Sequence, residues 1–593
     1  MNKIQYQVSA VNPHAHLFCV TLAFFPTKQQ VAQLTLPSWI PGSYMIRDFA
    51  KNIVTLTATD ATGELEVNKT DKQSWQINHN NQKVTVQYQV YAWDLSVRSA
   101  HLDATHGFFN GTSLFLAVQG QEDYPCELII RKPDGEHYTH WKVATGLKRG
   151  VNTKVFDFGL YLADDYQQLI DCPVEMADFS HTKFTAHGID HYMVFTGKHY
   201  GDLERVAKDV KKLCELHLDL FTKPSDLTEY WFLTYITDDG FGGLEHCNST
   251  ALICSRFDLP SPNLPDTLDE GYKTFLSLCS HEYFHTWNVK RLKPKNFIPY
   301  DLTAESYTEQ LWAYEGITSY YDDISLLRTE LIAEQDYFRL LEKTISRVYR
   351  STGRHKQTVA ESSFDAWTKF YKQDENASNA IISYYTKGAL IALCLDLTLR
   401  SEGHGKSLDD VMKTLWQQHG ATGSGTVYED FLAAFNLHSQ QPIDSLLHQF
   451  VYTTDELPLV KLLAQVGVQL TFRQAKDPSD FCGIKSDDDY YPALEANFKN
   501  TPAGLVLTQV FDDGAAQIAG LSAKDTLLAI DQVRVTGANL RQLLNNIPKN
   551  KPVAVTIFRQ DALMNLQLTL KSAIKHVAQL TIVDKEKSKL WLQ

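Results

Sequence analysis

Short runs of alternating apolar and polar residues dominate residues 1–160. The clearest runs are residues 30–36, 53–58, 83–91 and 128–132. Turn formers separate them: Pro41-Gly42, Asn80-Asn81 and Pro133-Asp134-Gly135. Alternation with a period of two, broken by such turns, is typical of half-buried strands. The pattern predicts an N-terminal antiparallel β-sandwich in which residues 95–111, polar and aromatic, form a long ordered loop.

The period changes near residue 200. Apolar residues recur at three- and four-residue spacing over 202–221, which predicts a helix, and residues 229–236 (EYWFLTYI) predict a buried strand. The chain is then helix-rich to about residue 450, with predicted helices at 268–290, 307–329, 333–349, 380–400 and 408–419. Beyond residue 460 the pattern predicts strands at 467–472, 504–510, 526–530, 553–558 and 565–570, and a short helix at 539–546.

The composition of the chain excludes several classes of protein. A chain of 593 residues is too long for one hydrophobic core, and 44% hydrophobic with 21% charged residues excludes wholesale disorder. The formal charge of −14 argues against a general nucleic-acid-binding protein, because such proteins carry an excess of basic residues. No apolar run approaches the roughly 18 residues of a membrane span. The start also lacks the order of a signal peptide.

The cysteines favour a reducing compartment. There are nine of them, an odd number, and they are scattered without a C-x-x-C pair. Such spacing is typical of buried, reduced thiols and not of a disulfide framework or a thiolate zinc site. The sequence therefore predicts a cytoplasmic protein.

The sharpest chemical signal is the pattern H-E-x-x-H at residues 281–285, inside the predicted helix 268–290. His281 and His285 lie one helical turn apart on the same face, so both imidazoles can reach one tetrahedral metal ion. Glu282 lies beside that ion, placed to take a proton from the attacking water. The structural alternative is a chance Glu between two exposed histidines, which the apolar opposite face of the helix disfavours. The motif predicts one Zn²⁺ ion.

A catalytic zinc ion needs a third protein ligand and an open position. Glu315 lies in the apolar and aromatic run 311–316 (LWAYEG), where a carboxylate is costly to bury unless it is paired or binds a metal. A helix-surface role is its structural alternative. Glu305 and Glu309 are the competing ligands, in a more polar setting.

Together these residues resemble the gluzincin arrangement of two His and one Glu. Residues 242–246 (GGLEH) are similar to the G-x-M-E-N segment of zinc aminopeptidases, and residues 384–388 (YYTKG) to their Y-x-K-G segment. The β-rich start carries the segment 39–44 (WIPGSY), and the C-terminal region resembles a PDZ domain. From end to end, the chain resembles the glycyl aminopeptidase family, the PDZ-bearing relatives of aminopeptidase N.

The resemblance assigns roles that also have physical reasons. Glu245 would hold the protonated α-amine of the substrate, and Gly242 and Gly243 would let the substrate backbone approach closely. Tyr385 would donate a hydrogen bond to the oxyanion. Tyr384 is its rival, because adjacent tyrosines in a helix point about 100° apart and only one should face the site. The structural alternatives are a loop carboxylate for Glu245 and core aromatics for the tyrosines.

Two departures from the family pattern stand out. Leu244 and His246 replace the usual Met and Asn, which affects how the first side-chain pocket is closed. Ser319 stands where some gluzincins carry an Asp that orients the first histidine, and Asp322 and Asp323 are its possible substitutes.

The C-terminal module resembles a PDZ domain through the order of residues 504–507 (GLVL), 519–521 (AGL) and 525–531 (DTLLAID). PDZ domains grip an extended peptide terminus between a sheet edge and a helix. The insertion 483–500 carries Asp487, Asp488 and Asp489, which suit a peptide carboxylate poorly. The sequence leaves two roles open, a peptide-binding module and an inter-domain contact.

The expected fold is multidomain α+β. The expected domains are a β-sandwich (1–170), a thermolysin-like zinc catalytic domain (171–325), a helical domain that carries Tyr385 (326–460), a PDZ-like domain (461–575) and a tail (576–593) that is an extra strand or a loose end.

The expected function is a zinc metallo-aminopeptidase acting on peptides with a free N-terminus, and the resemblance implies a preference for Gly or Ala. Glu282 would deprotonate the attacking water and then protonate the leaving amine. One alternative is an endopeptidase whose PDZ-like module feeds chains to the site. Another is a non-catalytic peptide-binding scaffold, against which the intact Glu282 argues.

Overall fold

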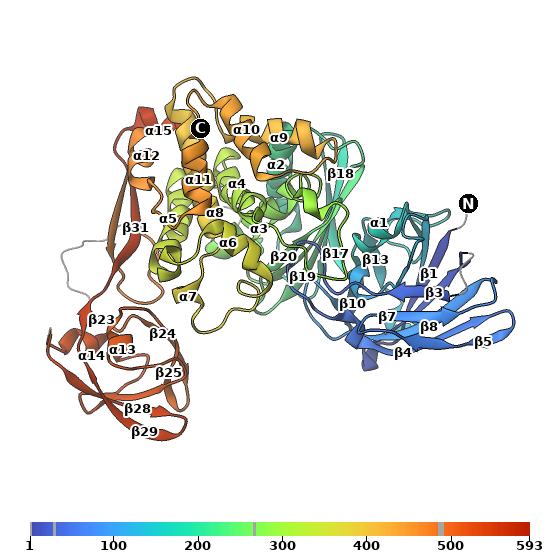
Figure 1. Cartoon of the computed structure of the whole chain (residues 1–593), viewed down its shortest axis with the longest axis horizontal. Helices are drawn as coiled ribbons and strands as arrows, with labels where there is room; N and C mark the ends of the chain where they lie inside the picture. The colour runs from blue at the N-terminus through green and yellow to red at the C-terminus, as the bar shows by residue number, and fades with distance from the viewer. Residues whose placement is uncertain (1–2, 28–30, 265–267, 484–491, 549, 593) are drawn as a thin grey trace. The chain divides into compact units, whose positions relative to one another are not determined.

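The computed structural model describes residues 3–27, 31–264, 268–483, 492–548 and 550–592 (Figure 1). The chain divides into two compact units: Met1–Ser306 with Trp416–Thr426, and Tyr307–Leu415 with Val427–Gln593. Among the described residues, no helix has the length and apolarity needed to cross a membrane. The acidic run Asp487–Asp489 lies outside the described residues.

The first unit opens with the β-rich region that the alternating pattern predicts. Its strands are β1 Ile4–Asn12, β2 Leu17–Phe24, β3 Val31–Thr35, β4 Ile53–Asp60, β5 Gly63–Leu65, β6 Val67–Lys69, β7 Ser74–Asn78, β8 Val84–Tyr91, β9 Ala100–Leu102, β10 His106–Phe109, β11 Ala117–Val118, β12 Cys126–Arg131, β13 Lys142–Thr145, β14 Lys148–Arg149, β15 Gly159–Ala163 and β16 Val174–Ala177. They form sheets in the orders β14-β15-β12-β1-β2-β8-β4-β5, β13-β16-β10-β9 and β11-β3-β7-β6. A short helix, α1 Tyr166–Ile170, precedes β16.

Two expectations for this region were wrong. Strands β1 and β12 pair in parallel, so the largest sheet is mixed and not wholly antiparallel. Residues 95–111 are not one long loop, because β9 and β10 pair as a hairpin inside them. All three residues of β9 and all four of β10 are buried, so this segment behaves as core and not as a surface connection.

The rest of the first unit is a five-stranded sheet with two helices. The sheet has the order β17-β18-β19-β21-β20, with β17 Ser180–Ala186, β18 Ile189–Thr196, β19 Glu229–Thr237, β20 Gly242–Glu245 and β21 Ser249–Ser255. Helices α2 Leu203–Phe221 and α3 Glu270–Phe284 pack on each other, α2 on β17 and α3 on β20 and β21. Asp202 caps α2 and Asp269 caps α3 through their side chains. Strand β20 therefore lies at the sheet edge beside α3.

The second unit begins with helices. They are α4 Ile317–Arg328, α5 Glu334–Arg350, α6 Val359–Phe364, α7 Ala377–Ala380, α8 Thr386–Ser401, α9 Leu408–Leu415, α10 Tyr428–His438, α11 Asp444–Tyr452 and α12 Leu459–Gln465. Helix α8 is the most buried of them and packs against α4, α5 and α12. The apolar spacing that predicted this helix-rich region thus corresponds to packing around one central helix.

A C-terminal β region completes the second unit. Its elements are β22 Val468–Gln474, β23 Pro492–Ala493, β24 Ala496–Thr501, β25 Gly504–Val510, α13 Ala515–Ile518, β26 Thr526–Ile530, β27 Val533–Arg534, α14 Leu540–Asn546, β28 Val553–Arg559, β29 Ala562–Leu568, β30 Lys571–Ser572, β31 Lys575–Ile582 and α15 Lys585–Leu592. Strand β31 pairs with β22 over its whole length, and Trp591 of α15 is fully buried. The tail is therefore an ordered strand and helix, the first of the two forms expected for it.

Candidate active site

The H-E-x-x-H residues lie at the C-terminal end of α3, and His285 is the first residue beyond the helix. The prediction of a helix to residue 290 was wrong, because α3 ends at Phe284. Thr286, Asn288 and Val289 have low helix propensity, and Val289 takes a positive φ of 100°. The turn that replaces the helix brings the backbone carbonyl of Asn288 to the ring of His285.

The two histidines converge. Nε2 of His281 and Nε2 of His285 lie 3.0 Å apart. Nδ1 of His285 lies 2.8 Å from the carbonyl oxygen of Asn288, so Nδ1 carries the proton and Nε2 presents its lone pair. A hydrogen bond on the far ring nitrogen is the support that metal-bound histidines usually have. The donor pair therefore fits a divalent metal ion.

Glu282 is held against the edge strand β20. Its side chain is 4% exposed, and a Cβ built on Gly243 would lie 2.7 Å from Cγ of Glu282 and closer still to its carboxyl group. Thr250 on the paired strand β21 places its hydroxyl 3.5 Å from Oε2 of Glu282. Gly243 is thus required because the carboxylate of Glu282 occupies the space of a side chain. By contrast, a Cβ on Gly242 would meet only Nη1 of Arg98, at 3.8 Å.

Glu245 lies at the end of β20, buried and not in a loop. It is 4% exposed, and its Oε1 has no hydrogen-bond partner among the described residues. Both carboxylate oxygens abut Gly42, where an added Cβ would lie 2.5 Å from each of them. Gly42 itself has a φ of +89°, which side chains rarely adopt. A buried carboxylate with an unused oxygen can accept a hydrogen bond from a cationic ligand.

The two departures from the family pattern have clear positions. Leu244 is fully buried in the core of the N-terminal sheets, on the opposite side of β20 from Glu245. His246 lies 3.3 Å from the carboxylate of Asp171, which also pairs with Lys290 at 2.7 Å. Burial raises the pKa of Asp171, but the charge of Lys290 and the hydrogen bond with His246 outweigh it and hold that pKa well below its usual value. His246 therefore belongs to a buried ion-pair network that anchors the end of the β20–β21 hairpin.

Arg98 is a site residue that sequence reasoning missed. Its Nη2 donates a hydrogen bond of 3.2 Å to the carbonyl oxygen of Gly243. In an antiparallel pair only alternate residues form backbone hydrogen bonds to the partner strand, and on β20 these are Gly242 and Leu244. The carbonyl of Gly243, which lies between them, therefore points away from β21. Arg98 thus holds the free edge of β20 from outside the sheet. Only the tertiary fold reveals this contact, since 145 residues separate its partners.

In the second unit, Glu315 lies in a π-helical turn, Trp312–Gly316, directly before α4. The prediction of an α-helix from residue 307 was wrong. The hydroxyl of Thr308 accepts a hydrogen bond from the backbone N–H of Gln310, and this local bond competes with the start of a helix. Glu315 is 1% exposed. Its competitors Glu305 and Glu309 are exposed, and Glu309 accepts a hydrogen bond from the hydroxyl of Tyr452.

The two tyrosines lie before α8 and not within a helix. The chain at Ile382 bonds to the side chains of Gln357 and Ser362, so the predicted helix 380–400 begins only at Thr386. The rings of Tyr384 and Tyr385 stack with centroids 4.7 Å apart, which differs from the expected divergence of about 100°. Tyr384 is fully buried, whereas Tyr385 is half-buried.

Glu315 acts electrostatically on both tyrosines. Burial raises the pKa of Tyr385 well above its usual value, and the negative charge of Glu315 raises it further. The pKa of Tyr384 is also raised, by burial, by Tyr371 and by Glu315. Both phenols therefore stay protonated at neutral pH and can serve as hydrogen-bond donors.

A contact between two glycines fixes this arrangement. A Cβ on Gly316 would lie 2.5 Å from Cα of Gly388, so the π-helical turn and the start of α8 touch backbone to backbone. Lys387 beside it is 3% exposed, and burial lowers its pKa. The glycine of the segment 384–388 therefore has a packing role. Ser319, Asp322 and Asp323 lie half-buried on α4 of the same unit.

Comparison with known proteins shows which family the chain resembles. Residues 5–178 match the peptidase M61 N-terminal domain, and residues 274–391 match the M61 glycyl aminopeptidase domain. The crystal structure of an aminopeptidase N family protein from Idiomarina loihiensis is 45% identical and covers 100% of both chains, with a TM-score of 0.96. The structure of native yeast LTA4 hydrolase is 13% identical, with a TM-score of 0.45, over 77% of this chain and 68% of that one.

The protein is therefore a peptidase of the metallopeptidase class. More narrowly, the chain belongs to the M61 glycyl aminopeptidase family, which confirms the family expected from the motifs.

Proposed function

We propose that the protein is a zinc-dependent aminopeptidase that removes the N-terminal residue, Gly or Ala, from peptides. One observation carries the proposal: the buried carboxylate of Glu245 keeps an unused oxygen, and it lies on the same edge strand that packs on Glu282. A protonated α-amine would satisfy that oxygen. Peptides and proteins with free N-termini are the substrates that this recognition implies.

His281, His285 and Glu315 would hold one Zn²⁺ ion. The convergence of the two Nε2 atoms at 3.0 Å, the burial of Glu315 and the span of the matched catalytic domain over all three residues support this assignment. Two imidazoles and one carboxylate are a common donor set for catalytic zinc. When bound, zinc polarises the scissile carbonyl and lowers the pKa of water.

Glu282 is the proposed general base and later the acid for the leaving amine. Gly243 and Thr250 fix its carboxylate, so its approach to the attacking water is set by β20 and β21. Positioning of this kind is a large part of general-base efficiency. Tyr385 is the proposed donor to the oxyanion, because it stays protonated and is more accessible than Tyr384.

The preference for a small first residue rests on the family. Gly42 lies against both oxygens of the Glu245 carboxylate, where an added Cβ would be 2.5 Å from each. The cytoplasm is the proposed location, since all nine cysteines are free thiols. We also propose the five-domain division given above, with a thermolysin-like catalytic domain.

A PDZ-like role for residues 461–575 is part of the proposal, and the contacts favour its inter-domain form. Asn379 of the helical region donates to the carbonyl oxygen of Val510 and accepts from the backbone of Asp512. Arg350 of α5 donates to Asn497 on β24. A cavity of about 140 Å³ beside β24 and α14, where a PDZ domain grips its peptide, is also lined by Arg350 and residues 475–478.

One experiment tests the assignment against its rivals. The zinc-loaded protein is incubated with free and N-acetylated alanyl and glycyl peptides, and the products are identified by mass spectrometry. The proposal expects cleavage after the first residue of the free peptides only. Internal cleavage of acetylated peptides would favour the endopeptidase, and no cleavage of either would favour the scaffold.

A further inference from the structure

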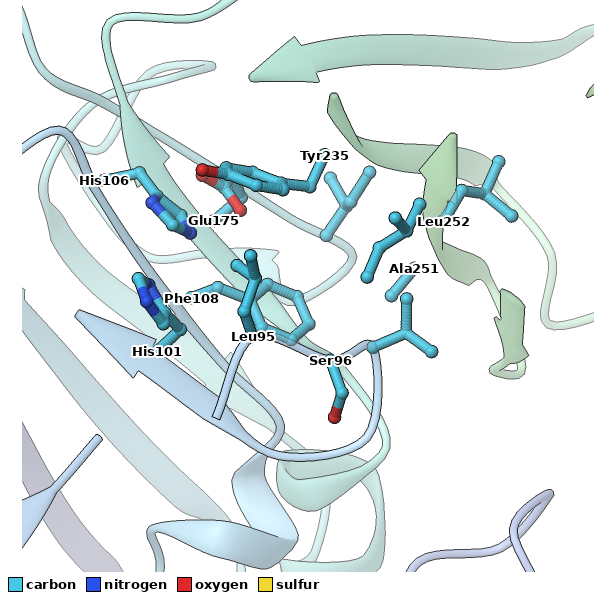
Figure 2. Close-up of a pocket in the computed structure, with 12 residues that line it drawn as sticks. Leu95, Ser96, His101, His106, Phe108, Glu175, Tyr235, Ala251 and Leu252 are labelled. Carbon is cyan, nitrogen blue, oxygen red and sulfur yellow. The ribbon is translucent and has the colours of Figure 1, made fainter. Parts of the chain in front are cut away.

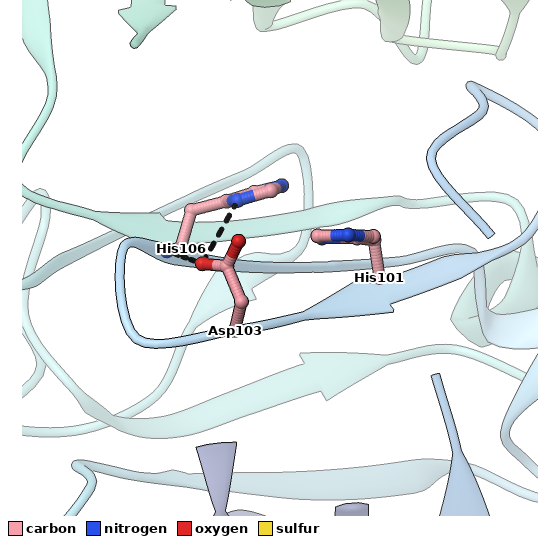
Figure 3. Close-up of side chains that lie close together, drawn as sticks. All are labelled: His101, Asp103 and His106. Atoms are coloured by element: carbon pink, nitrogen blue, oxygen red, sulfur yellow. Dashed lines mark hydrogen bonds and ion pairs between the residues drawn. The ribbon is translucent and has the colours of Figure 1, made fainter. Parts of the chain in front are cut away.

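The hairpin β9–β10 carries a second group of metal-binding side chains, His101, Asp103 and His106 (Figure 3). Their nitrogen and oxygen donor atoms all lie within 4.8 Å of one another. His101 is 4% exposed and His106 is 1% exposed, and Oδ1 of Asp103 lies 3.8 Å from Nδ1 of His106. These side chains belong to the first unit, and the proposed catalytic residues do not include them.

Glu175 is an independent observation that points to a ligand at the same place. Phe108 pairs with His101 on one side and with Glu175 on the other, so the three side chains share one face of the sheet, with Phe108 between His101 and Glu175. Glu175 is 3% exposed, and its Oε1 has no hydrogen-bond partner among the described residues. Burial raises the pKa of this carboxyl to about 7.

One small cavity joins these groups. His101, His106 and Glu175 line it together with Tyr235, and Figure 2 shows Glu175 beside His106 at its polar end. Its volume of about 20 Å³ is enough for one ion or one water. The unpaired oxygen of Glu175 buried there is a cost to the folded state that a bound cation would remove.

We propose that His101, Asp103 and His106 form a second binding site, for one divalent transition-metal ion such as Zn²⁺ or Co²⁺, and that the carboxylate of Glu175 faces the same cavity. Such ions favour imidazole nitrogen, whereas Mg²⁺ and Ca²⁺ prefer ligand sets made of oxygen alone. Tetrahedral ligands with bonds of about 2.0–2.1 Å lie about 3.3 Å apart, so the donor atoms must draw closer on binding.

Binding also requires one imidazole to turn. The rings of His101 and His106 stack at 4.8 Å with planes 17° apart, so their lone pairs run nearly parallel. Tyr235 stacks on His106 at 4.3 Å, and Trp93 stacks on His101 at 4.6 Å. Trp93 is 52% exposed whereas Tyr235 is half-buried, so His101 has the more exposed stacking partner and is the ring that we expect to turn.

The site is connected to the edge strand of the proposed active site. Leu252 and Ile253 of β21 line the cavity and pair with Gly243 and Gly242. The segment that leads into β9 carries Arg98, which bonds to Gly243. We expect occupancy to change turnover by moving β20. This consequence rests on the proposed function, whereas the binding of the ion does not.

Equilibrium dialysis against Co²⁺ alone tests the site in a full-length double variant, His281→Ala with His285→Ala, which removes the proposed catalytic ligands. We expect one Co²⁺ per chain with an absorption spectrum of nitrogen and oxygen ligation. Adding His101→Gln should weaken binding at least tenfold. Adding His14→Ala, a change of an exposed histidine in the same unit, should leave it unchanged.

The buried His101 variant could unfold, so Asp103→Asn provides a second test. Asp103 is 26% exposed, and asparagine keeps its shape and its turn bonds while removing the charge. We expect at least tenfold weaker Co²⁺ binding with unchanged circular dichroism. Absence of Co²⁺ from the double variant, or binding that survives Asp103→Asn, would overturn the proposal. Neither result depends on peptidase activity, which the wild-type protein tests separately.

Discussion

Replacing Gly243 with alanine tests the coupling between the edge strand and the proposed base. The added Cβ would lie 2.7 Å from Cγ of Glu282, whereas carbon atoms in contact need about 3.5 Å or more. Since Gly243 lies between Gly242 and Leu244, which make the ladder bonds to β21, the flexible Glu282 side chain must move, by about 1 Å. A misplacement of that size costs about a hundredfold in rate, which equals about 2.7 kcal/mol of transition-state stabilisation.

The neighbouring Gly242→Ala variant is the matched comparison. It adds the same methyl group to the same strand, but the nearest atom is Nη1 of Arg98 at 3.8 Å, an ordinary contact. We expect Gly242→Ala to lose far less activity than Gly243→Ala. The measurement is kcat/KM on an alanyl p-nitroanilide, with circular dichroism and zinc content determined for both variants.

Two results would contradict the proposed link between Gly243 and the position of Glu282. If Gly243→Ala retains kcat/KM within about threefold of the wild type, the geometry of Glu282 does not depend on β20 as described. Equal losses in the two glycine variants would show that the effect comes from the strand backbone or the substrate and not from displacement of Glu282.

Three further predictions follow from the same contacts. Glu282→Gln should keep the metal ion but lose at least roughly a hundredfold in kcat, and an unchanged rate in steady-state assays would refute its role as base. Glu245→Gln should raise KM for free peptides by at least roughly tenfold, since a charge-assisted bond to the α-amine contributes about 1.5–3 kcal/mol; an equal KM for wild type and variant would contradict the assignment. Tyr385→Phe should lower kcat by about 10²–10³. Tyr384→Phe, which changes a fully buried ring, should mainly lower the melting temperature. The reverse pattern would exchange the roles of the two tyrosines.

Sequence periodicity predicted most elements but not where they end. The helices at 202–221 and 333–349 and the strands at 504–510, 526–530 and 553–558 agree with the structure, because their apolar spacing reflects one continuous buried face. The ends of the helices around the proposed site were wrong. There, side chains of Thr308, Gln357 and Ser362 bind the backbone that a longer helix would need. A single-sequence pattern carries no information on such long-range partners.

The candidate site shows the same division. The pattern H-E-x-x-H is local, so the residues on α3 could be identified from spacing alone. Gly42 and Arg98 could not, because the contact of Gly42 with Glu245 and that of Arg98 with Gly243 join segments about 150–200 residues apart. The cluster on the β9–β10 hairpin was also missed, since the segment 95–111 was interpreted as a loop and its histidines were not considered together.

The glycine pair in the second unit has a mechanical consequence. With no side chain between Gly316 and Gly388, the two backbones interlock, and neither segment can slide without first separating from the other. Glu315 and Tyr385, which lie on these two segments, are therefore expected to move together when that unit fluctuates. A chimera that exchanges one of these segments between family members should lose its fit unless the other is exchanged with it.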